Sequence, residues 1–394
     1  MKLEGWLPSQ DCLATLQVLQ LLGVWIRPLT SDPDVLVIEG VGLHGLSEPK
    51  TILNFGNSGT GLRLMTGVLA AQSFNSQVTG DASLRKRPMS RLYRPLNLMG
   101  ASISTVDGEY APLLFSAVQV LRPISYELQV PSAQVISALQ LASLYVDGKS
   151  QITIQGHYRD HTERLIKYLH PYLHKNILST EETITIKIPG DISSAAFFMV
   201  AATLIPGSML MINNVGVNLT RTGVIDILRQ MGAKIIMQPI GEFQGESVAK
   251  LLISSAFLIG IDIPVSLVSI AIDELPIIAI AAACAKGQTR IRSAYELREK
   301  ESDRIQSIAN GLKILGISVT VFEDGLDIVG GTIKGGEVLS FGDHRIAMAF
   351  AIAGAVGTEP VTILNTDNVK TSFPSFVGAL KQLGIKIKVN KEKN

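Results

Sequence analysis

The stretch Leu19-Gln-Leu-Leu-Gly-Val-Trp-Ile26 (LQLLGVWI) joins an apolar helix end, a glycine and the start of an alternating strand. The glycine supplies the left-handed backbone conformation that ends a helix. Four further segments repeat this pattern: LNLMGASI (96–103), LRQMGAKI (228–235), LKILGISV (312–319) and LKQLGIKI (380–387). Five copies of one helix–glycine–strand joint predict that the chain is built from similar α+β units.

The spacing of these joints predicts the number of units. The interval from Gly100 to Gly232 is about twice as long as the others, and Leu165–Tyr172 lies within it. That segment has the apolar helix pattern without the glycine, so we interpret it as a degenerate sixth joint. Six units, three in each of two domains, are therefore expected. Too few residues precede Gly23 to complete the first unit, so we expect it to be incomplete at its N-terminus.

Length and composition agree with a soluble protein of two domains. A chain of 394 residues that is 46% hydrophobic exceeds the size of one compact core. We place a hinge at 188–191, between domains 1–188 and 189–394. The net charge of +1 is too small for the molecule as a whole to attract nucleic acid or an anionic membrane. Two cysteines form no disulfide framework, and the N-terminus lacks the apolar core of a signal peptide, which predicts a cytoplasmic location.

A strongly apolar run, Leu251–Ile272, is interrupted by Asp262 and Pro264 and is rich in β-branched residues. We interpret it as buried strands rather than as a membrane span. Elsewhere strand-like and helix-like patterns alternate, which is typical of a mixed α/β (α+β) fold. The strand-like stretches are 35–38, 151–154 and 183–188, and the helix-like stretches are 62–71, 133–144, 195–204 and 346–356.

The segment Tyr295–Ile305 (YELREKESDRI) carries seven charged residues in eleven positions of a chain that is only 18% charged. Helical spacing would place Lys300 and Arg304 on one face, with Glu301 one turn below Arg304. One interpretation is a solvated helix face with i,i+4 ion pairs. The other is an anion site that also holds a carboxylate for proton transfer.

Two glycine-containing turns in the first domain are candidate anion sites. Asn57–Arg63 (NSGTGLR) opens a helix whose bare N–H groups suit a phosphate or a carboxylate, although Ser58 or Thr60 is equally consistent with a simple N-cap. Gly80–Met89 (GDASLRKRPM) contains three adjacent cations that repel one another unless they are solvated or share an anion. A P-loop is excluded, because the pattern G-x-x-x-x-G-K-[ST] is absent.

Three polar segments are expected to begin helices. Ser132 is the expected cap of the helix that opens at Ala133, with Gln134 in its first turn. Gly190–Ser194 (GDISS) is expected to be another cap structure. Asp343 is the expected cap of the helix at 346–356.

Two charged residues at helix starts also suggest chemistry. Asp273 lies between two apolar runs, so it is either a partly buried acid suited to proton transfer or the cap of the helix that contains Pro276. Arg345 places a cation near the positive end of a helix, a position that is unfavourable unless an anion is bound.

Together these motifs resemble the 5-enolpyruvylshikimate-3-phosphate (EPSP) synthase family. The matching segments cover about 11–376 in order, and they are NSGTGLRL, GDASLRKRPM, PSAQVISALQLASL, RDHTERL, PGDISSAAFF, IDELPIIAIAAA, LREKESDRI, GDHRIAMAF and TSFPSF. The resemblance implies the two-domain enolpyruvyl transferase fold, an inside-out α/β barrel of six βαβαββ-type repeats, the first incomplete. It places the active site in the cleft between the domains.

The resemblance also implies a reaction of the shikimate pathway, in aromatic amino acid biosynthesis. The 5-hydroxyl of shikimate 3-phosphate would attack C2 of phosphoenolpyruvate while the methylene is protonated, and phosphate would leave from the adduct. Two phosphates and two carboxylates would share one site, which explains a demand for arginine and lysine. The implied enzyme is a monomer that needs no metal, redox cofactor or covalent nucleophile.

The resemblance assigns roles to individual residues. Phosphoenolpyruvate would contact Gly59, Arg87, Arg304 and Arg345, and Gln134 would lie between the two ligands. Shikimate 3-phosphate would contact Ser132, Ala133, Arg159, Asp273 and Lys300. Asp273 would also accept the hydroxyl proton, and Glu301 is the candidate for protonating the methylene.

Two departures from the family pattern bear on activity. The N-terminal K-S-x-S-x-R-type motif, which supplies a lysine, a serine and an arginine to both ligands, is absent from this chain. Each missing charged hydrogen bond removes ~1.5–3 kcal/mol, so we expect severely reduced or no activity. Near the C-terminus, Thr371 stands where some relatives carry a site lysine, and Lys370 is its neighbour, so neither residue is assigned a role.

Two alternatives stand beside this interpretation. The related UDP-N-acetylglucosamine enolpyruvyl transferase would need a cysteine in Gly80–Met89, where there is none. The other alternative is an N-terminally truncated remnant of the enzyme that folds, or binds a partner, with weak turnover or none.

Overall fold

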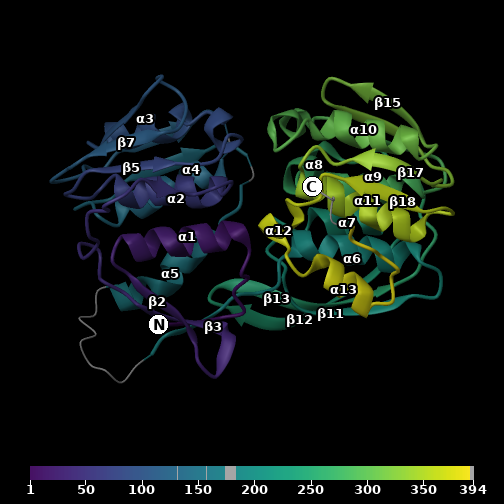
Figure 1. Ribbon diagram of the computed structural model, residues 1–394, viewed down its shortest axis with the longest axis horizontal. Coiled ribbons are helices and arrows are strands. Elements are labelled where there is room, and N and C mark those ends of the chain that lie inside the picture. Colours follow the sequence, from purple (N-terminus) through teal and green to yellow (C-terminus); the bar gives the residue numbers. More distant parts are fainter. Residues whose placement is uncertain (131, 157, 174–182, 391–394) are drawn as a thin grey trace. The chain divides into compact units, whose positions relative to one another are not determined.

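The computed structural model describes residues 1–130, 132–156, 158–173 and 183–390. The chain divides into two compact units (Figure 1). The first unit is Met1–Ile188 with Phe243–Glu246, and the second unit is Pro189–Glu242 with Ser247–Asn394.

The described part of the first unit contains three open sheets, with strand orders β10-β1-β3-β2, β4-β5-β7-β6 and β8-β9. Its strands are β1 (Lys2–Glu4), β2 (Trp25–Leu29), β3 (Asp32–Glu39), β4 (Leu53–Asn54), β5 (Ser76–Thr79), β6 (Ser102–Thr105), β7 (Leu113–Ser116), β8 (Ser125–Leu128), β9 (Gln151–Ile154) and β10 (Thr185–Lys187). Its helices are α1 (Gln10–Leu21), α2 (Gly59–Leu69), the 3₁₀ turn η1 (Leu84–Lys86), α3 (Ser90–Leu98), α4 (Ala133–Ser143) and α5 (His161–Leu173).

The second unit also contains three open sheets in its described residues, with orders β11-β13-β12, β14-β16-β15 and β17-β18. Its strands are β11 (Met209–Gly216), β12 (Lys234–Phe243), β13 (Glu246–Ser254), β14 (Gln288–Ile291), β15 (Ser318–Phe322), β16 (Gly325–Val329), β17 (Gly336–Leu339) and β18 (Val361–Leu364). Its helices are α6 (Ile192–Leu204), α7 (Gly223–Gln230), α8 (Val265–Ile270), α9 (Leu275–Ala283), η2 (Tyr295–Glu299), α10 (Arg304–Ile314), α11 (His344–Val356), α12 (Val369–Ser372) and α13 (Phe376–Gln382). The predicted mixed α/β fold is confirmed, although no sheet closes into a barrel within the described residues.

The five predicted glycine joints share one backbone geometry. Their glycines have φ between 83° and 101°, and they are Gly23, Gly100, Gly232, Gly316 and Gly384. In every joint, the residue after the glycine donates a hydrogen bond to the carbonyl five positions earlier, as Val24 does to Leu19. This bond is the Schellman closure of a helix end. The prediction of these five joints from the local sequence is therefore confirmed.

The strand expected after each joint is present in four cases. β2, β6, β12 and β15 follow the first four glycines, whereas 385–390 forms no strand. An alternating pattern becomes a strand only where a neighbouring strand pairs with it, and 385–390 is paired with none. The degenerate segment Leu165–Tyr172 lies inside α5, and residues 174–182, where its joint would fall, lie outside the described residues.

The other predicted elements correspond to observed ones. Stretches 35–38, 151–154 and 183–188 contain or lie within β3, β9 and β10, and the four predicted helices are α2, α4, α6 and α11. Three of these helices begin two or three residues earlier than predicted, because their caps lie further upstream. Ser58, Asp191 and Asp343 accept the hydrogen bonds from the first-turn N–H groups of α2, α6 and α11.

The apolar run Leu251–Ile272 differs from its prediction. Only its first residues belong to a strand, β13, and Val265–Ile270 forms the helix α8. Leu251 and Ile253 are buried in β13, and Val268 is buried in α8, so the run packs into the core through two kinds of element. Within the described residues, every helix is too short or too polar to cross a bilayer.

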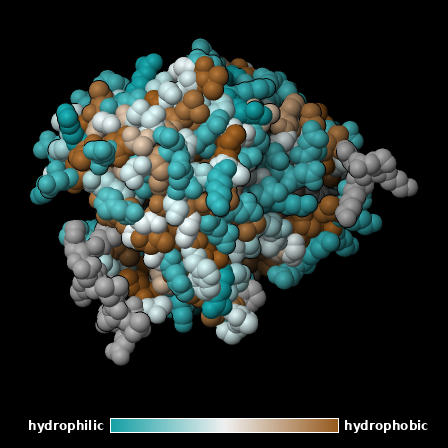
Figure 2. Space-filling view, turned by 60° about the vertical axis from the view of Figure 1, so that its left-hand side comes forward, coloured by the Kyte–Doolittle hydropathy of each residue, from teal (hydrophilic) through white to brown (hydrophobic). Residues whose placement is uncertain are grey.

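Each unit buries its own hydrophobic core. In the second unit, α6, α9 and α11 contact one another, and all nine residues of α9 are buried (Figure 1). A helix that is apolar on all sides is expected at such a central position. On the face drawn in Figure 2, hydrophilic and apolar side chains are interspersed. The starts of α6, α9 and α11 carry charged residues, which are Asp191, Glu274 and Asp343.

Gly67 lies where α2 and α4 approach most closely. A Cβ atom at this position would lie 2.1 Å from the backbone oxygen of Ala138. We expect Gly67→Ala to lower the free energy of unfolding by about 1–3 kcal/mol, because the helices must move apart. Gly378→Ala in α13 is the matched control, since nothing lies within 4 Å of its Cβ and alanine favours a helix. Urea unfolding measures both, and equal effects would contradict the close contact.

Candidate active site

The charged segment Tyr295–Ile305 is not one helix. Its first half is the 3₁₀ turn η2, Lys300 is extended, and α10 begins at Arg304. Asp303 caps α10 by accepting a hydrogen bond of 3.0 Å from the N–H of Gln306, which starts a new helix inside the segment. The helical spacing predicted for Lys300 and Arg304 is therefore wrong. The fold instead brings both cations to the same carboxylate, because Asp273 Oδ1 lies 3.6 Å from Lys300 Nζ and 3.5 Å from Arg304 Nη1.

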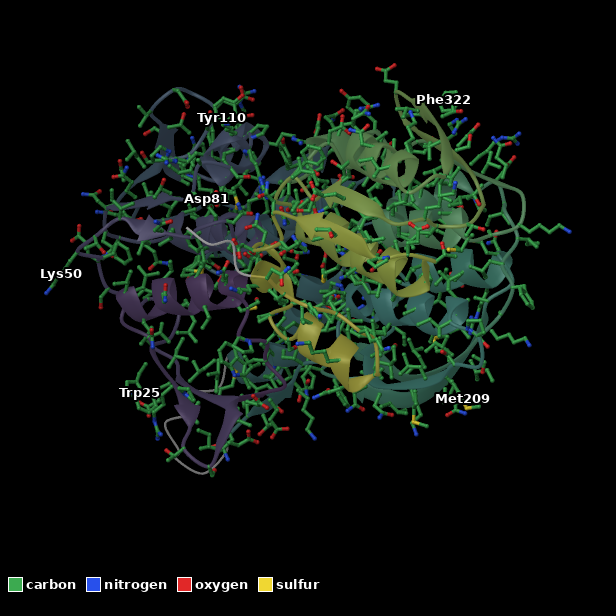
Figure 3. The ribbon with its side chains drawn as sticks, turned by 45° about the vertical axis from the view of Figure 1, so that its right-hand side comes forward. Trp25, Lys50, Asp81, Tyr110, Met209 and Phe322 are labelled. Atoms are coloured by element: carbon green, nitrogen blue, oxygen red, sulfur yellow. The ribbon has the colours of Figure 1, made fainter. Side chains whose placement is uncertain are left out.

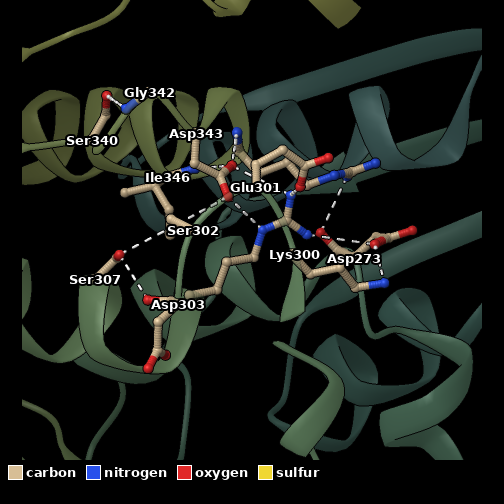
Figure 4. Close-up of polar contacts among 12 residues, drawn as sticks. Asp273, Lys300, Glu301, Ser302, Asp303, Ser307, Ser340, Gly342, Asp343 and Ile346 are labelled. Atoms are coloured by element: carbon tan, nitrogen blue, oxygen red, sulfur yellow. Dashed lines mark hydrogen bonds and ion pairs between the residues drawn. The ribbon is translucent and has the colours of Figure 1, made fainter. Parts of the chain in front are cut away.

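Arg304 is the centre of this cluster. Its side chain is 1% exposed, and three carboxylates surround its guanidinium (Figure 4). Nε donates to Asp343 Oδ2 at 2.7 Å and Nη2 donates to Glu301 Oε2 at 2.6 Å. Burial alone would lower the pKa of Arg304, but the charges of Asp343 and Glu301 raise it. Arg304 is therefore a buried cation that stays charged, and the more exposed charged groups of the site lie around it.

Asp343 performs two tasks at the start of α11. Its carboxylate caps the helix by accepting from the N–H groups of Arg345 and Ile346, and it also accepts from Arg304. Burial would raise the pKa of Asp343, yet the neighbouring Arg304 charge and its hydrogen bond hold that pKa below its ordinary value. The cap was predicted from the sequence. The pairing with Arg304 was not, because 39 residues separate the two.

Asp273 is not a helix cap. Glu274 occupies the N-cap position of α9 without a side-chain cap bond, and its carboxylate instead accepts a hydrogen bond from Ser193. The Asp273 side chain, 15% exposed, contacts Lys300 and Arg304 instead. Its backbone oxygen accepts a hydrogen bond of 3.1 Å from Arg345 Nη1. The expected partly buried acid is thus present, with three cations about it.

Four partly exposed charges surround buried Arg304 in the second unit. Their side chains are between 15% and 24% exposed, and they are Asp273, Lys300, Glu301 and Arg345. Lys300 also contacts Glu296. Two accessible cations and two accessible carboxylates can bind an anion and exchange protons at one place.

A second cluster of cations lies at the start of α2 in the first unit. Ser58 caps this helix by accepting from the N–H of Gly61 at 3.2 Å, so the predicted cap is confirmed. A Cβ atom on Gly59 would lie 2.9 Å from Arg63 Nη1 and 3.1 Å from Arg87 Nη1. Both guanidinium groups therefore lie over the helix N-terminus, and the glycine leaves them the space. A helix N-terminus with two cations is a ready site for phosphate or carboxylate.

Hydrogen bonds fix the side chains around this helix end. Gln134 accepts from Arg63 Nη1 at 3.0 Å and donates to Thr60 Oγ1 at 2.9 Å. Arg87 donates to Asn57 Oδ1 at 3.3 Å. Asn57 in turn donates to the carboxylate of Asp81 at 2.7 Å, and Asp81 is labelled in Figure 3. Arg63 was not assigned a role from the sequence. Its position four residues after Gly59 could have indicated one, because residues four apart lie on the same face of a helix.

The remaining candidates of the first unit lie at two helix starts. Ser132 caps α4 through a hydrogen bond of 3.4 Å from the N–H of Val135, Ala133 is the first residue of that helix, and Gln134 follows. This places Gln134 beside the α2 cluster. Arg159 precedes α5 by two residues in the same unit. Among the described residues, no group of three or more His, Cys, Asp or Glu side chains is arranged to hold a metal ion.

Lys370 and Thr371, which were given no role from the sequence, lie in α12. Thr371 is buried there, while Lys370 is exposed.

The acid stability of the second unit should depend on His344, the first residue of α11. Burial and the Arg345 charge lower the pKa of His344 to about 4. The unfolded chain therefore takes up this proton at higher pH than the folded chain, and stability falls as the pH drops from about 6.5 to about 4. The loss approaches about 3 kcal/mol at the low end. The depressed pKa of Asp343 removes stability only at lower pH.

We expect His344→Asn to flatten the pH dependence in this window, because asparagine does not titrate. Urea unfolding at pH 7.0, 5.5 and 4.5 measures the slope. His44→Asn, at an exposed histidine of the first unit, is the control. If the free energy of unfolding of the His344 variant depended on pH as steeply as that of the unaltered chain, His344 would not be the source of this pH dependence.

Comparisons with known proteins agree on one family. Residues 1–380 match the family described as EPSP synthase (3-phosphoshikimate 1-carboxyvinyltransferase). The 3-phosphoshikimate 1-carboxyvinyltransferase of Legionella pneumophila (strain Corby) is 50% identical over 382 residues, which is 95% of this chain and 88% of that protein. The protein of the same name from Coxiella burnetii (strain RSA 493 / Nine Mile phase I) is 48% identical over 394 residues, 98% of this chain and 90% of that protein.

Solved structures give the same result. The EPSP synthase of Acinetobacter baumannii matches with a TM-score of 0.87 and 43% identity, covering 99% of this chain and 91% of that chain. The enolpyruvyl transferase NikO from Streptomyces tendae matches with a TM-score of 0.76 over 98% of this chain and 89% of that chain. Its identity of 15% supports the fold alone.

Proposed function

The chain belongs to the EPSP synthase family of carboxyvinyl transferases, and we propose that the two cation clusters described above bind the substrates of this family. The substrates are shikimate 3-phosphate and phosphoenolpyruvate, which bring two phosphates and two carboxylates. The observation that carries the proposal is the buried Arg304 with Asp273, Lys300 and Glu301 around it. A carboxylate for proton transfer and cations for an anionic substrate meet there.

The second unit supplies the groups for proton transfer. Asp273 accepts the proton of the 5-hydroxyl as that oxygen bonds to C2 of phosphoenolpyruvate, and Glu301 protonates C3. The adduct then loses phosphate from C2 and a proton from C3, which regenerates the vinyl group on the product. Lys300, Arg304 and Arg345 balance the negative charge that collects during the addition. Lys300 and Asp273 also bind shikimate 3-phosphate in this assignment.

The first unit supplies groups that bind and orient the substrates. Gly59 and Arg87 take phosphoenolpyruvate at the N-terminus of α2, and Gln134 lies between the two ligands. Ser132, Ala133 and Arg159 take shikimate 3-phosphate. Support comes from the convergence of Arg63 and Arg87 over Gly59 and from the bond between Arg63 and Gln134. This proposal places residues of both predicted domains, 1–188 and 189–394, around one pair of substrates.

The resemblance implies further substrate contacts from an N-terminal K-S-x-S-x-R-type motif. The K-S-x-S-x-R-type motif is absent from the 394 residues. We expect turnover to be slower by about two to four powers of ten, because each missing charged hydrogen bond removes ~1.5–3 kcal/mol of binding. A polypeptide that includes such a motif in frame should recover the rate. Near-normal turnover of the 394-residue chain would contradict this expectation.

The assay for the proposed function is phosphate release. Phosphate should form only when shikimate 3-phosphate and phosphoenolpyruvate are both present, since shikimate 3-phosphate supplies the attacking hydroxyl. Release from phosphoenolpyruvate alone would indicate a phosphatase and contradict the transfer. We further propose that the chain acts in the cytoplasm, which its two free cysteines support, and that it acts as a monomer, as the family resemblance implies.

A further inference from the structure

A buried carboxylate directly follows Asp273 in the sequence and has no role in the reaction described above. The Glu274 side chain is fully buried at the start of α9. Ser193 Oγ donates a short hydrogen bond to Glu274 Oε1. The same oxygen lies 3.9 Å from Arg221 Nη2 and 4.0 Å from Arg345 Nη1. A buried carboxylate is tolerated only where cations and hydrogen bonds compensate it, and Glu274 has both.

Arg221 anchors this arrangement to α6. Its Nη2 donates to Ser193 Oγ at 2.6 Å and to Asp191 Oδ1 at 3.2 Å. Asp191 is itself fixed, because it caps α6 by accepting from Ser193 and Ser194. Burial would raise the pKa of Asp191, yet the charges of Arg221 and Arg345 hold it below its ordinary value. The chain of contacts thus runs from a helix cap, through Arg221 and Ser193, to Glu274.

Glu274 then meets the site through Arg345. Arg345 Nη1 lies near the Glu274 carboxylate and donates to the backbone oxygen of Asp273 at 3.1 Å. The Arg345 guanidinium therefore contacts both Asp273, the candidate proton acceptor, and Glu274, the next residue in the chain. We propose that Glu274, with Ser193 and Arg221, is a positioning residue that holds Arg345 against Asp273 for binding phosphoenolpyruvate. The consequence for substrate binding rests on the proposed function, whereas the position of Arg345 does not.

The charge of Glu274 is the property that matters. Glutamine has the same shape and still accepts the hydrogen bond of Ser193, but it carries no charge. In Glu274→Gln, Arg221 and Arg345 lose the carboxylate that both approach, and Arg345 keeps a hydrogen bond to the neutral backbone oxygen of Asp273. An exposed carboxylate offers a matched control, because Asp262 is 70% exposed and pairs with Arg290 at 3.1 Å on the surface of the same unit.

Crystal structures and calorimetry of the 394-residue chain test the proposal. In Glu274→Gln we expect Arg345 Nη1 to leave the Asp273 backbone oxygen. We also expect the Kd of phosphoenolpyruvate, measured with saturating shikimate 3-phosphate, to rise at least tenfold. The Kd of shikimate 3-phosphate alone should change less than threefold. Ser193→Ala should also raise the Kd of phosphoenolpyruvate, but by a smaller factor. Asp262→Asn should leave the Kd values of both ligands unchanged.

The outcomes separate this inference from the proposed function. An Arg345 that stays in place in Glu274→Gln overturns the positioning role. So does an equal weakening of both ligands together with a lower Tm, which would mark a general structural role. If the unaltered chain binds no phosphoenolpyruvate, the proposed function fails, and the position of Arg345 in the two crystal structures still decides the inference.

Discussion

Arg304→Met should lower the free energy of unfolding by about 3–5 kcal/mol and abolish enolpyruvyl transfer. The guanidinium is buried, and removing it leaves the fully buried carboxylate of Asp343 without its cation. An uncompensated charge in the interior is far more costly than a missing surface pair. Denaturation in urea, followed by circular dichroism, measures the stability, and phosphate release measures the activity.

Arg290→Met is the matched control for this variant. Arg290 also pairs with two aspartates, but its side chain is half exposed, and such pairs contribute about 1 kcal/mol or less. Replacing both Arg304 and Asp343 by apolar residues should be less destabilising than the sum of the single changes, since no lone charge remains. A loss below about 1 kcal/mol in Arg304→Met would show that the carboxylate finds another partner.

Asp273→Asn should reduce the rate of enolpyruvyl transfer by a factor of about 10²–10⁴, with a much smaller effect on stability. Asparagine keeps the shape of the side chain but cannot accept the proton of the 5-hydroxyl. The loss of this carboxylate leaves Lys300 partly exposed to water, and the buried Arg304 stays paired with Glu301 and Asp343. Single-turnover phosphate release with both substrates measures the chemical step.

Asp262→Asn, at the exposed aspartate, is the control for Asp273→Asn and should retain the full rate. If Asp273→Asn transferred at a rate within threefold of the unaltered chain, another group would have to accept the proton. Glu301 would then be the next carboxylate to test, since it contacts the same guanidinium.

Features determined by neighbouring residues were predictable from the sequence. Each glycine joint closes with a hydrogen bond over five positions, so a short segment contains all of its determinants. The caps at Ser58, Ser132 and Asp343 act over three positions and were predicted for the same reason. The resemblance to a known family then assigned substrates and roles to candidates that local patterns had already marked, such as Asp273, Glu301 and Arg345.

Features determined by tertiary contacts were not predictable. Lys300 and Arg304 were expected on one helix face, but the cap at Asp303 divides the segment, and they meet at Asp273 through the fold. Ser193 and Glu274 bond across 81 residues. No periodic pattern in the sequence predicts a contact over such a distance along the chain. The buried part of the site could therefore be seen only in the structure.

The most direct test of the account is a ³¹P NMR time course with shikimate 3-phosphate, phosphoenolpyruvate and the 394-residue chain, followed for hours to detect slow turnover. We expect the phosphoenolpyruvate signal to decline while inorganic phosphate and one new phosphate ester rise in equal amounts. We also expect Asp273→Asn to slow all three changes together. Spectra that stay identical to those without protein, or phosphate that forms without the new ester, would contradict enolpyruvyl transfer by this chain.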